Sequence, residues 1–150
     1  MSIAAKGVTF ALSFDTVDQG VHTGEFDMVL SRVTIGAPEV KTYYVDVPGM
    51  DGAVDLTSYL GDTVRYKNRT LQFEFTFLVK DAGLLSAYTQ LLGCLHGIYR
   101  GYIKIDGDDR FYYSGRVFVG DLKKGAVSKV TVKCDCEPYK TNIATHEKVL

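Results

Sequence analysis

The 150-residue chain has no tryptophan, only three prolines and three cysteines, and a formal net charge of −1. Without a surplus of Lys and Arg it lacks the basic face that nucleic-acid-binding proteins use. No apolar run approaches the ~20 residues of a membrane helix, and the first six residues lack the apolar segment of a secretory signal. We therefore expect a protein made in the cytoplasm, with no membrane contact and with unpaired thiols.

Tyrosine, phenylalanine and glycine are abundant, with 10, 8 and 15 copies. Aromatic residues favour strands, and glycines favour turns. The length fits one domain of about 100–200 residues. We therefore expect a single, β-rich domain over 1–150.

Alternating apolar and polar residues predict the strands. The clearest pattern runs from Val64 to Val79, where one face carries Leu71, Phe73, Phe75, Phe77 and Val79. Shorter patterns predict strands over 8–14, 26–35, 40–47, 98–105, 111–119 and 127–136. Phe10, Leu12 and Phe14 should share one face of the first strand. Turns are expected over 106–109 and 120–125.

A helical period replaces the alternation between Leu84 and His96, where an apolar stripe recurs at i, i+3, i+4 and i+7. Its members are Leu84, Leu85, Tyr88, Leu91, Leu92 and Leu95. Asp81 is a candidate N-cap, and the His96 side chain a candidate partner for the last carbonyls. A further helical turn is possible over 56–60. Together these patterns predict a mostly antiparallel β-sandwich or flattened barrel with one α-helix, about Leu84–His96.

The stretch from Tyr43 to Thr57 concentrates residues with special backbone preferences. Pro48 cannot donate to a ladder, so strand pairing should stop there. Gly49 and Gly52 permit positive φ on either side of Met50-Asp51. The stretch is predicted to be a loop of fixed shape between two strands.

Three groups of residues could carry chemistry. The aspartates of 106–109 could bind calcium or lie in a solvated turn; Arg110 and Phe111 occupy positions where an EF-hand loop needs an oxygen ligand and a glycine. Cys134 and Cys136 fit two buried core positions better than half of a zinc site. Asp46, Asp51 and Asp55 could supply a glycosidase pair, but nothing selects two of them. We expect no catalytic residue, metal or cofactor, and hence a non-enzymatic domain.

Several motifs occur in a characteristic order. They are Val45–Thr57 (VDVPGMDGAVDLT), Tyr66–Leu71 (YKNRTL), a helix ending in His96-Gly97, Tyr113–Val117 (YSGRV) and Cys136–Lys140 (CEPYK). In order and spacing, from about Val40 to Lys140, they resemble the N-terminal, tail-tube-like domain of siphophage distal tail proteins.

The resemblance implies a structural protein of the virion tail, assembled in the cytoplasm of the bacterial host. Such proteins form a hexameric ring around a channel through which DNA passes without specific binding. One face of the ring meets the tail tube protein, and the other meets the tail-tip hub, a tail-associated lysin or a fibre protein.

In this family the loop of Pro48, Gly49, Asp51, Gly52 and Asp55 would be a shape-determining element near subunit contacts. Arg69 would either pair with a loop aspartate or be a solvated residue at the start of a strand.

Many members of the family continue into a second, carbohydrate-binding-like domain, which is not expected within this chain. It could be a short member, a separate ring protein or a chain cut at the domain boundary. Two other functions stay open: a monomeric carbohydrate-binding β-sandwich module and a hydrolase that uses the Asp cluster.

Overall fold

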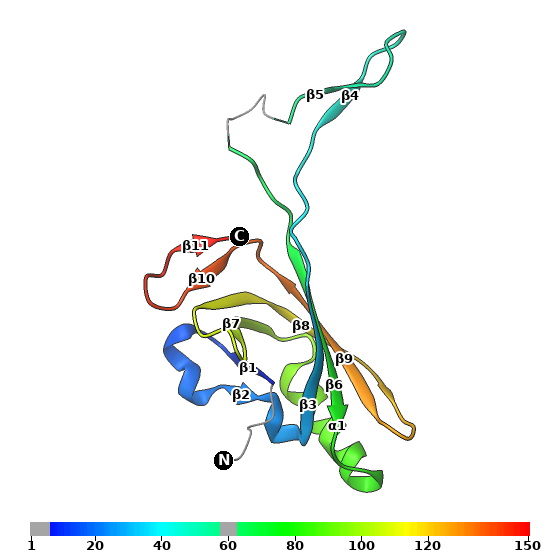
Figure 1. Cartoon of the computed structure of the whole chain (residues 1–150), viewed down its shortest axis with the longest axis vertical. Helices are drawn as coiled ribbons and strands as arrows, with labels where there is room; N and C mark the ends of the chain where they lie inside the picture. The colour runs from blue at the N-terminus through cyan, green and yellow to red at the C-terminus, as the bar shows by residue number, and fades with distance from the viewer. Residues whose placement is uncertain (1–6, 58–62) are drawn as a thin grey trace.

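The computed structural model describes residues 7–57 and 63–150, and the possible helical turn over 56–60 falls largely outside them. Most strands form one antiparallel nine-stranded sheet in the order β2-β1-β7-β8-β9-β6-β3, with β10 and β11 attached beside β8 (Figure 1). A separate two-stranded sheet pairs β4 with β5. The elements are β1 Val8–Ala11, η1 Phe14–Gln19, β2 Val21–His22, η2 Thr23–Phe26, β3 Met28–Ile35, β4 Tyr44–Asp46, β5 Ala53–Asp55, β6 Arg69–Phe77, α1 Asp81–Leu95, β7 Tyr99–Ile105, β8 Phe111–Lys123, β9 Lys129–Cys136, β10 Lys140–Asn142 and β11 Lys148–Val149.

The core forms on one face of the β6–β9 pair. The alternation predicted over Val64–Val79 is confirmed within β6, because its apolar face is buried while Thr70 and Gln72 are exposed. The strand itself is shorter than predicted and covers only Arg69–Phe77. Opposite it, β9 buries the face that carries Cys134 and Cys136. Buried residues of β1, β7 and α1 belong to the same cluster. The sheet therefore curves around one core, and the fold is mostly antiparallel β, β-sandwich-like, with one α-helix in the described residues.

The helix is confirmed, but its ends differ from the prediction. Lys80, not Asp81, is the N-cap residue, and no side chain caps it. At the other end the His96 side chain does not bond the last carbonyls, although its backbone N–H donates to Leu92. Its Nδ1 instead accepts a hydrogen bond from the Val119 N–H at 3.0 Å. The Arg100 guanidinium instead donates to the Cys94 carbonyl at 2.7 Å. A cation thus lies at the negative end of the helix dipole, supplied by a strand that follows the helix.

The first predicted strand is too long. It ends at Ala11, and the Leu12 side chain is 63% exposed rather than on the core face with Phe10. The Thr16 hydroxyl accepts a hydrogen bond from the Ser13 N–H at 3.0 Å. Such local side-chain bonds compete with strand pairing, and here they start η1.

The predicted turn over 120–125 is also wrong at its start, because β8 continues to Lys123 with an irregular register between Val119 and Leu122. A Cβ added at Gly120 would lie 2.7 Å from the Thr131 carbonyl oxygen. This glycine therefore permits close approach of two strands.

The burial of β6 gives a direct test of the core. Phe73→Ala should lower the free energy of unfolding by about 3–5 kcal/mol, because a fully buried ring is replaced by a cavity. Leu78→Ala, just beyond the same strand at a side chain that is 65% exposed, should change it by less than about 0.5 kcal/mol. Urea denaturation followed by circular dichroism measures both. Equal losses of unfolding free energy in the two variants would show that Phe73 is no more buried than Leu78.

Candidate functional site: a projecting arm with an acidic tip

A long arm leaves the sheet between β3 and β6; it comprises residues 36–57 and 63–68 of the described chain (Figure 1). Its base continues the β3–β6 pairing. The Gly36 N–H donates to the Thr70 carbonyl at 2.9 Å, and the Lys67 N–H to the Glu39 carbonyl at 2.7 Å. Val40 forms an isolated bridge with Tyr66. The arm is thus anchored by backbone hydrogen bonds at its base.

The tip of the arm, residues 43–57, is a small hairpin. β4 and β5 pair Tyr44 with Asp55 and Asp46 with Ala53. The predicted strand over 40–47 is therefore only Tyr44–Asp46, since no sheet lies beside the rest of it. The positive φ predicted for the two glycines is confirmed, with +80° at Gly49 and +73° at Gly52.

Thr57 closes the hairpin against Asp55. The Thr57 N–H donates to Asp55 Oδ1 at 2.9 Å, its hydroxyl donates to the same oxygen, and its Oγ1 accepts from the Tyr43 N–H at 3.1 Å. The hydroxyl bond, then the N–H bond, lower the pKa of the Asp55 carboxyl. Asp55 is thus an acceptor that closes the hairpin.

The tip exposes large apolar side chains that the body leaves uncovered. Tyr43 is 62% exposed and Met50 is 52% exposed; Tyr44 and Val47 are exposed as well. Pro48, Asp51 and Gly52 lie at the same apex, also exposed. Exposed apolar residues that gather on one projecting element mark interaction surfaces.

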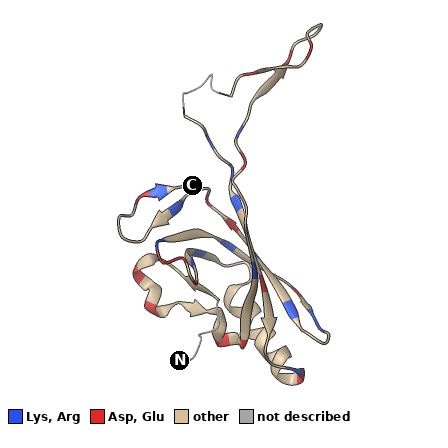
Figure 2. Ribbon diagram, viewed as in Figure 1, with Lys and Arg blue, Asp and Glu red and all other residues tan. Residues whose placement is uncertain are grey.

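Charge is segregated along the arm (Figure 2). The tip carries Asp46, Asp51 and Asp55 and no Lys or Arg. In the described residues the base carries Lys41, Arg65 and Lys67, and Arg69 follows as the first residue of β6. One described acid, Glu39, lies among them, with its carboxylate 3.5 Å from Lys67. The two ends of the arm therefore have opposite charge.

Within one subunit, neither prediction for Arg69 is correct. The side chain is buried, with 4% of it exposed, so it is not a solvated strand start. Its Nη2 donates to the Leu150 carbonyl at 2.7 Å, and its guanidinium lies over the Tyr113 ring at 5.7 Å. The ion pairs of the described residues do not include it, because the loop aspartates lie at the far end of the arm.

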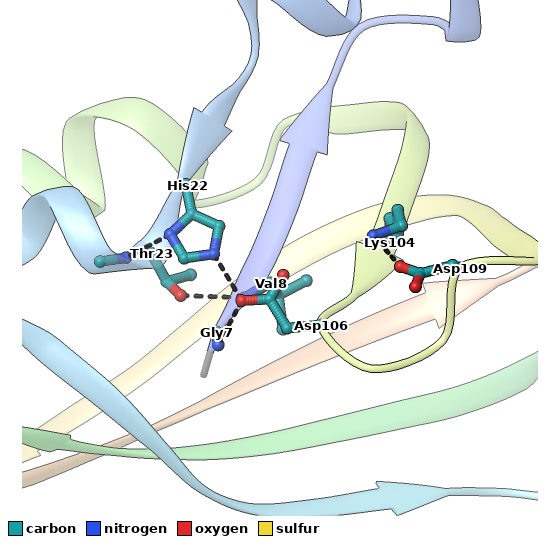
Figure 3. A network of polar contacts seen from close by, with 8 residues as sticks. Gly7, Val8, His22, Thr23, Lys104, Asp106 and Asp109 are labelled. Carbon is teal, nitrogen blue, oxygen red and sulfur yellow. Dashed lines mark hydrogen bonds and ion pairs between the residues drawn. The ribbon is translucent and has the colours of Figure 1, made fainter. Parts of the chain in front are cut away.

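The acidic turn between β7 and β8 bonds neighbouring parts of the body (Figure 3). Asp106 Oδ2 accepts from the Gly7 N–H at 3.0 Å and from His22 Nε2 at 2.8 Å. His22 Nδ1 in turn accepts from the Gly24 N–H at 3.0 Å. Asp109 pairs with Lys104 at 3.0 Å. Asp106 thus bonds the protein itself rather than solvent. Asp109 is 85% exposed, as expected for a solvated turn.

The cysteine pair is also structural. Cys134 and Cys136 are both buried and free. A hydrogen bond to Cys136, together with burial, raises the pKa of the Cys134 thiol, whereas a zinc ligand is a thiolate. In the described residues no three His, Cys, Asp or Glu side chains gather as metal ligands.

The arm, the burial of Arg69 and the His22–Asp106 pair were all missed from the sequence. His22 and Asp106 are 84 positions apart, and no local pattern links them.

The Asp106 network predicts a measurable difference within one turn. Asp106→Ala should lower the free energy of unfolding by about 1–3 kcal/mol, because it leaves the Gly7 N–H and His22 Nε2 without their acceptor. Asp109→Ala, the matched control, removes only an ion pair whose carboxylate is 85% exposed and should cost less than about 1 kcal/mol. Chemical denaturation at neutral pH compares them. A larger loss of unfolding free energy for Asp109→Ala than for Asp106→Ala would contradict the role assigned to Asp106.

No described helix is both long enough and apolar enough to cross a membrane. No family model matches the sequence, and no curated protein does.

Among solved structures the chain is similar to the crystal structure of the Dit (gp 19.1) protein of phage SPP1, with a TM-score of 0.70 and 17% sequence identity. That protein is described as a paradigm of the hub adsorption apparatus in phages that infect Gram-positive bacteria. The match covers 92% of this chain and 52% of the SPP1 protein, so the chain spans about half the length of that relative. The chain therefore has the fold found in this phage hub protein.

Proposed function

We propose that the chain is a structural subunit of a phage or prophage tail, a distal tail or baseplate-hub protein that joins the tail tube to the tail tip. The observation that carries the proposal is the common fold with SPP1 Dit over 92% of the chain. The order of sequence motifs supports it independently, since it resembles distal tail proteins without reference to the structure. On this proposal the 150 residues are one tail-tube-like domain.

The subunits would form a hexameric ring in the virion tail, assembled in the cytoplasm of the bacterial host. The tail tube protein would bind one face, and the tail-tip hub, a tail-associated lysin or a fibre protein the other. DNA would pass through the channel without specific binding. The net charge of −1 supports this last point, because tight DNA binding needs clustered cations.

The arm is the element best suited to hold such a ring. Its tip contributes nothing to the core of its own subunit, yet it presents exposed Tyr43, Tyr44 and Met50. An obligate subunit contact buries roughly 2,000 Å² or more, and an extended arm supplies much surface for its mass. Pro48, Gly49 and Gly52 would fix the shape of the part that docks.

Native mass spectrometry and negative-stain electron microscopy of the full chain test the proposal. We expect the chain to form rings. Their formation should require no catalytic activity. A chain that stays monomeric at the highest attainable concentration would contradict the ring, and glycan binding by that monomer would favour a carbohydrate-binding module instead.

Shortening the arm tests its role separately. Replacing residues 44–55 by a Gly-Ser linker should abolish rings, because it removes the exposed apolar tip. The melting temperature of the body should stay within a few degrees, since those residues pack against no core element. A control chain with Tyr99, an exposed aromatic on the body, changed to Ser should still assemble. Rings from the shortened chain would show that the arm is dispensable.

A further inference from the structure

Charge is segregated across the body of the fold as well as along the arm. Residues 13–27 contain η1 and η2 and include no Lys or Arg. Their acidic residues are Asp15, Asp18, Glu25 and Asp27. Residues 122–134 contain the end of β8 and most of β9 and include no Asp or Glu. Their lysines are Lys123, Lys124, Lys129 and Lys133. Because the net charge of the chain is −1, this separation comes from where the charges are placed, not from an excess of one sign.

The two segments lie on opposite sides of the body. η1 connects β1 to β2, the two strands at one end of the sheet, whereas β9 lies between β8 and β6 toward the other end. In Figure 1, η1 is the blue helical segment on one side of the body, and the turn between β8 and β9 extends from the other side. Figure 2 shows acidic residues on the first side and basic residues on the second. The segments around η1 and β9 can therefore meet only between copies.

The basic segment borders a hollow on the face of the sheet that points away from the core. Lys133 lies opposite Phe118 in the pairing of β8 with β9, and both side chains are exposed, Phe118 to 44%. An open pocket of about 360 Å³ lies beside them, and Gly120 lines it without a side chain to fill it. Lys123 and Lys133 also line the pocket, against one acid, Asp121. We call Phe118, Lys123 and Lys133 the basic surface.

The acidic segment presents complementary groups. Asp15 and Asp18 are exposed on η1, and Leu12, two residues before η1, is 63% exposed. We call these three residues the acidic surface. The ion pairs of the described residues involve other groups than the charges of these two surfaces. Opposite charges that stay unpaired beside exposed apolar side chains fit two surfaces that bind each other.

We propose that the acidic surface of one copy binds the basic surface of a second copy, with the aspartates facing the lysines and Leu12 packed on Phe118. This rests on the proposed function, because it names a contact between the bodies of neighbouring subunits that is separate from the arm. Two different surfaces meet, so the contact is head-to-tail, and such contacts form a ring when the rotation between copies closes. Because exposed ion pairs add little affinity, the charges chiefly set the orientation and the rate of association.

Exchanging the charges tests the pairing. An acid-reversed chain carries Asp15→Lys and Asp18→Lys, and a base-reversed chain carries Lys123→Glu and Lys133→Glu. At low salt each chain alone should associate about tenfold more weakly than the unchanged chain, because like charges meet. A mixture of the two chains should regain association, since copies that alternate bring opposite charges together at every contact. Sedimentation velocity of each chain and of the mixture measures the effect.

Cross-linking reports the contact even where it is transient. In a Cys94→Ser background, chains with Leu12→Cys are mixed with chains carrying Phe118→Cys and treated with a short bismaleimide. The mixture should give cross-linked pairs, and high salt should reduce their yield. Adding the acid reversal to the Leu12→Cys chain should remove them. Leu85→Cys, at a side chain that is 49% exposed on α1, replaces Phe118→Cys as the matched control.

A second control separates the position of the charges from their sum. A chain with Lys80→Glu and Lys148→Glu, two exposed lysines outside both surfaces, has the same change of charge as the base-reversed chain and should associate normally. All variants are checked for unchanged melting, so that a loss of association reports on the surface and not on the fold.

The outcomes separate this pairing from the ring itself. Rings that form equally well from both reversed chains overturn the pairing and leave the ring proposal standing. Cross-links to Phe118 that form no faster than those to Leu85 overturn the pairing whether or not rings form. Charge-dependent cross-links to Phe118 without rings support the pairing and count against the ring. A mixture of reversed chains that associates no better than either chain alone also overturns direct contact.

Discussion

The antiparallel pairing of β3 with β6 is the interaction on which the rest of the structure depends. β6 buries its phenylalanines in the core and also pairs with β9. Its pairing with β3 runs from Met28↔Phe77 to Ile35↔Leu71 and then continues beyond the sheet into the base of the arm. A Cβ at Gly36 would lie 2.8 Å from the Thr70 carbonyl oxygen, so the close approach at this junction requires glycine. The core thus fixes the direction in which the arm leaves the body.

Arg69, the first residue of β6, connects that junction to the remainder of the chain. It lies over Tyr113 of β8 and bonds Leu150. Burial raises the pKa of the Tyr113 hydroxyl, and the nearby guanidinium partly offsets this. Arg69 therefore connects β6, β8 and Leu150 at the base of the arm.

The sequence predicted what depends on local periodicity. The alternation of β6 and β9 places a buried face correctly, because neighbouring residues alone set that pattern. The helical spacing of α1 does so for Leu84, Leu91 and Leu95 but not for Leu85, which is 49% exposed. The arm could not be predicted, since residues 40–47 alternate like any half-buried strand and only the absence of a neighbouring strand exposes them. Leu12 was misplaced for a different reason, because the strand ends at Ala11 and local Ser13–Thr16 bonds follow it. The partners of His22 and Arg69 come from residues far along the chain, and residue type alone does not select them.

The arm is hard to explain by the stability of one subunit. Ordering each backbone residue costs roughly 1–2 kcal/mol, and the tip recovers little of this, because its apolar side chains stay in water. Its local structure nevertheless restricts its shape: Pro48 fixes one φ, two glycines adopt positive φ, and Thr57 closes the hairpin. A surface ordered in advance loses less entropy when it docks. The cost of ordering the tip would be offset if a partner removed Tyr43, Tyr44 and Met50 from water, as happens when subunits assemble.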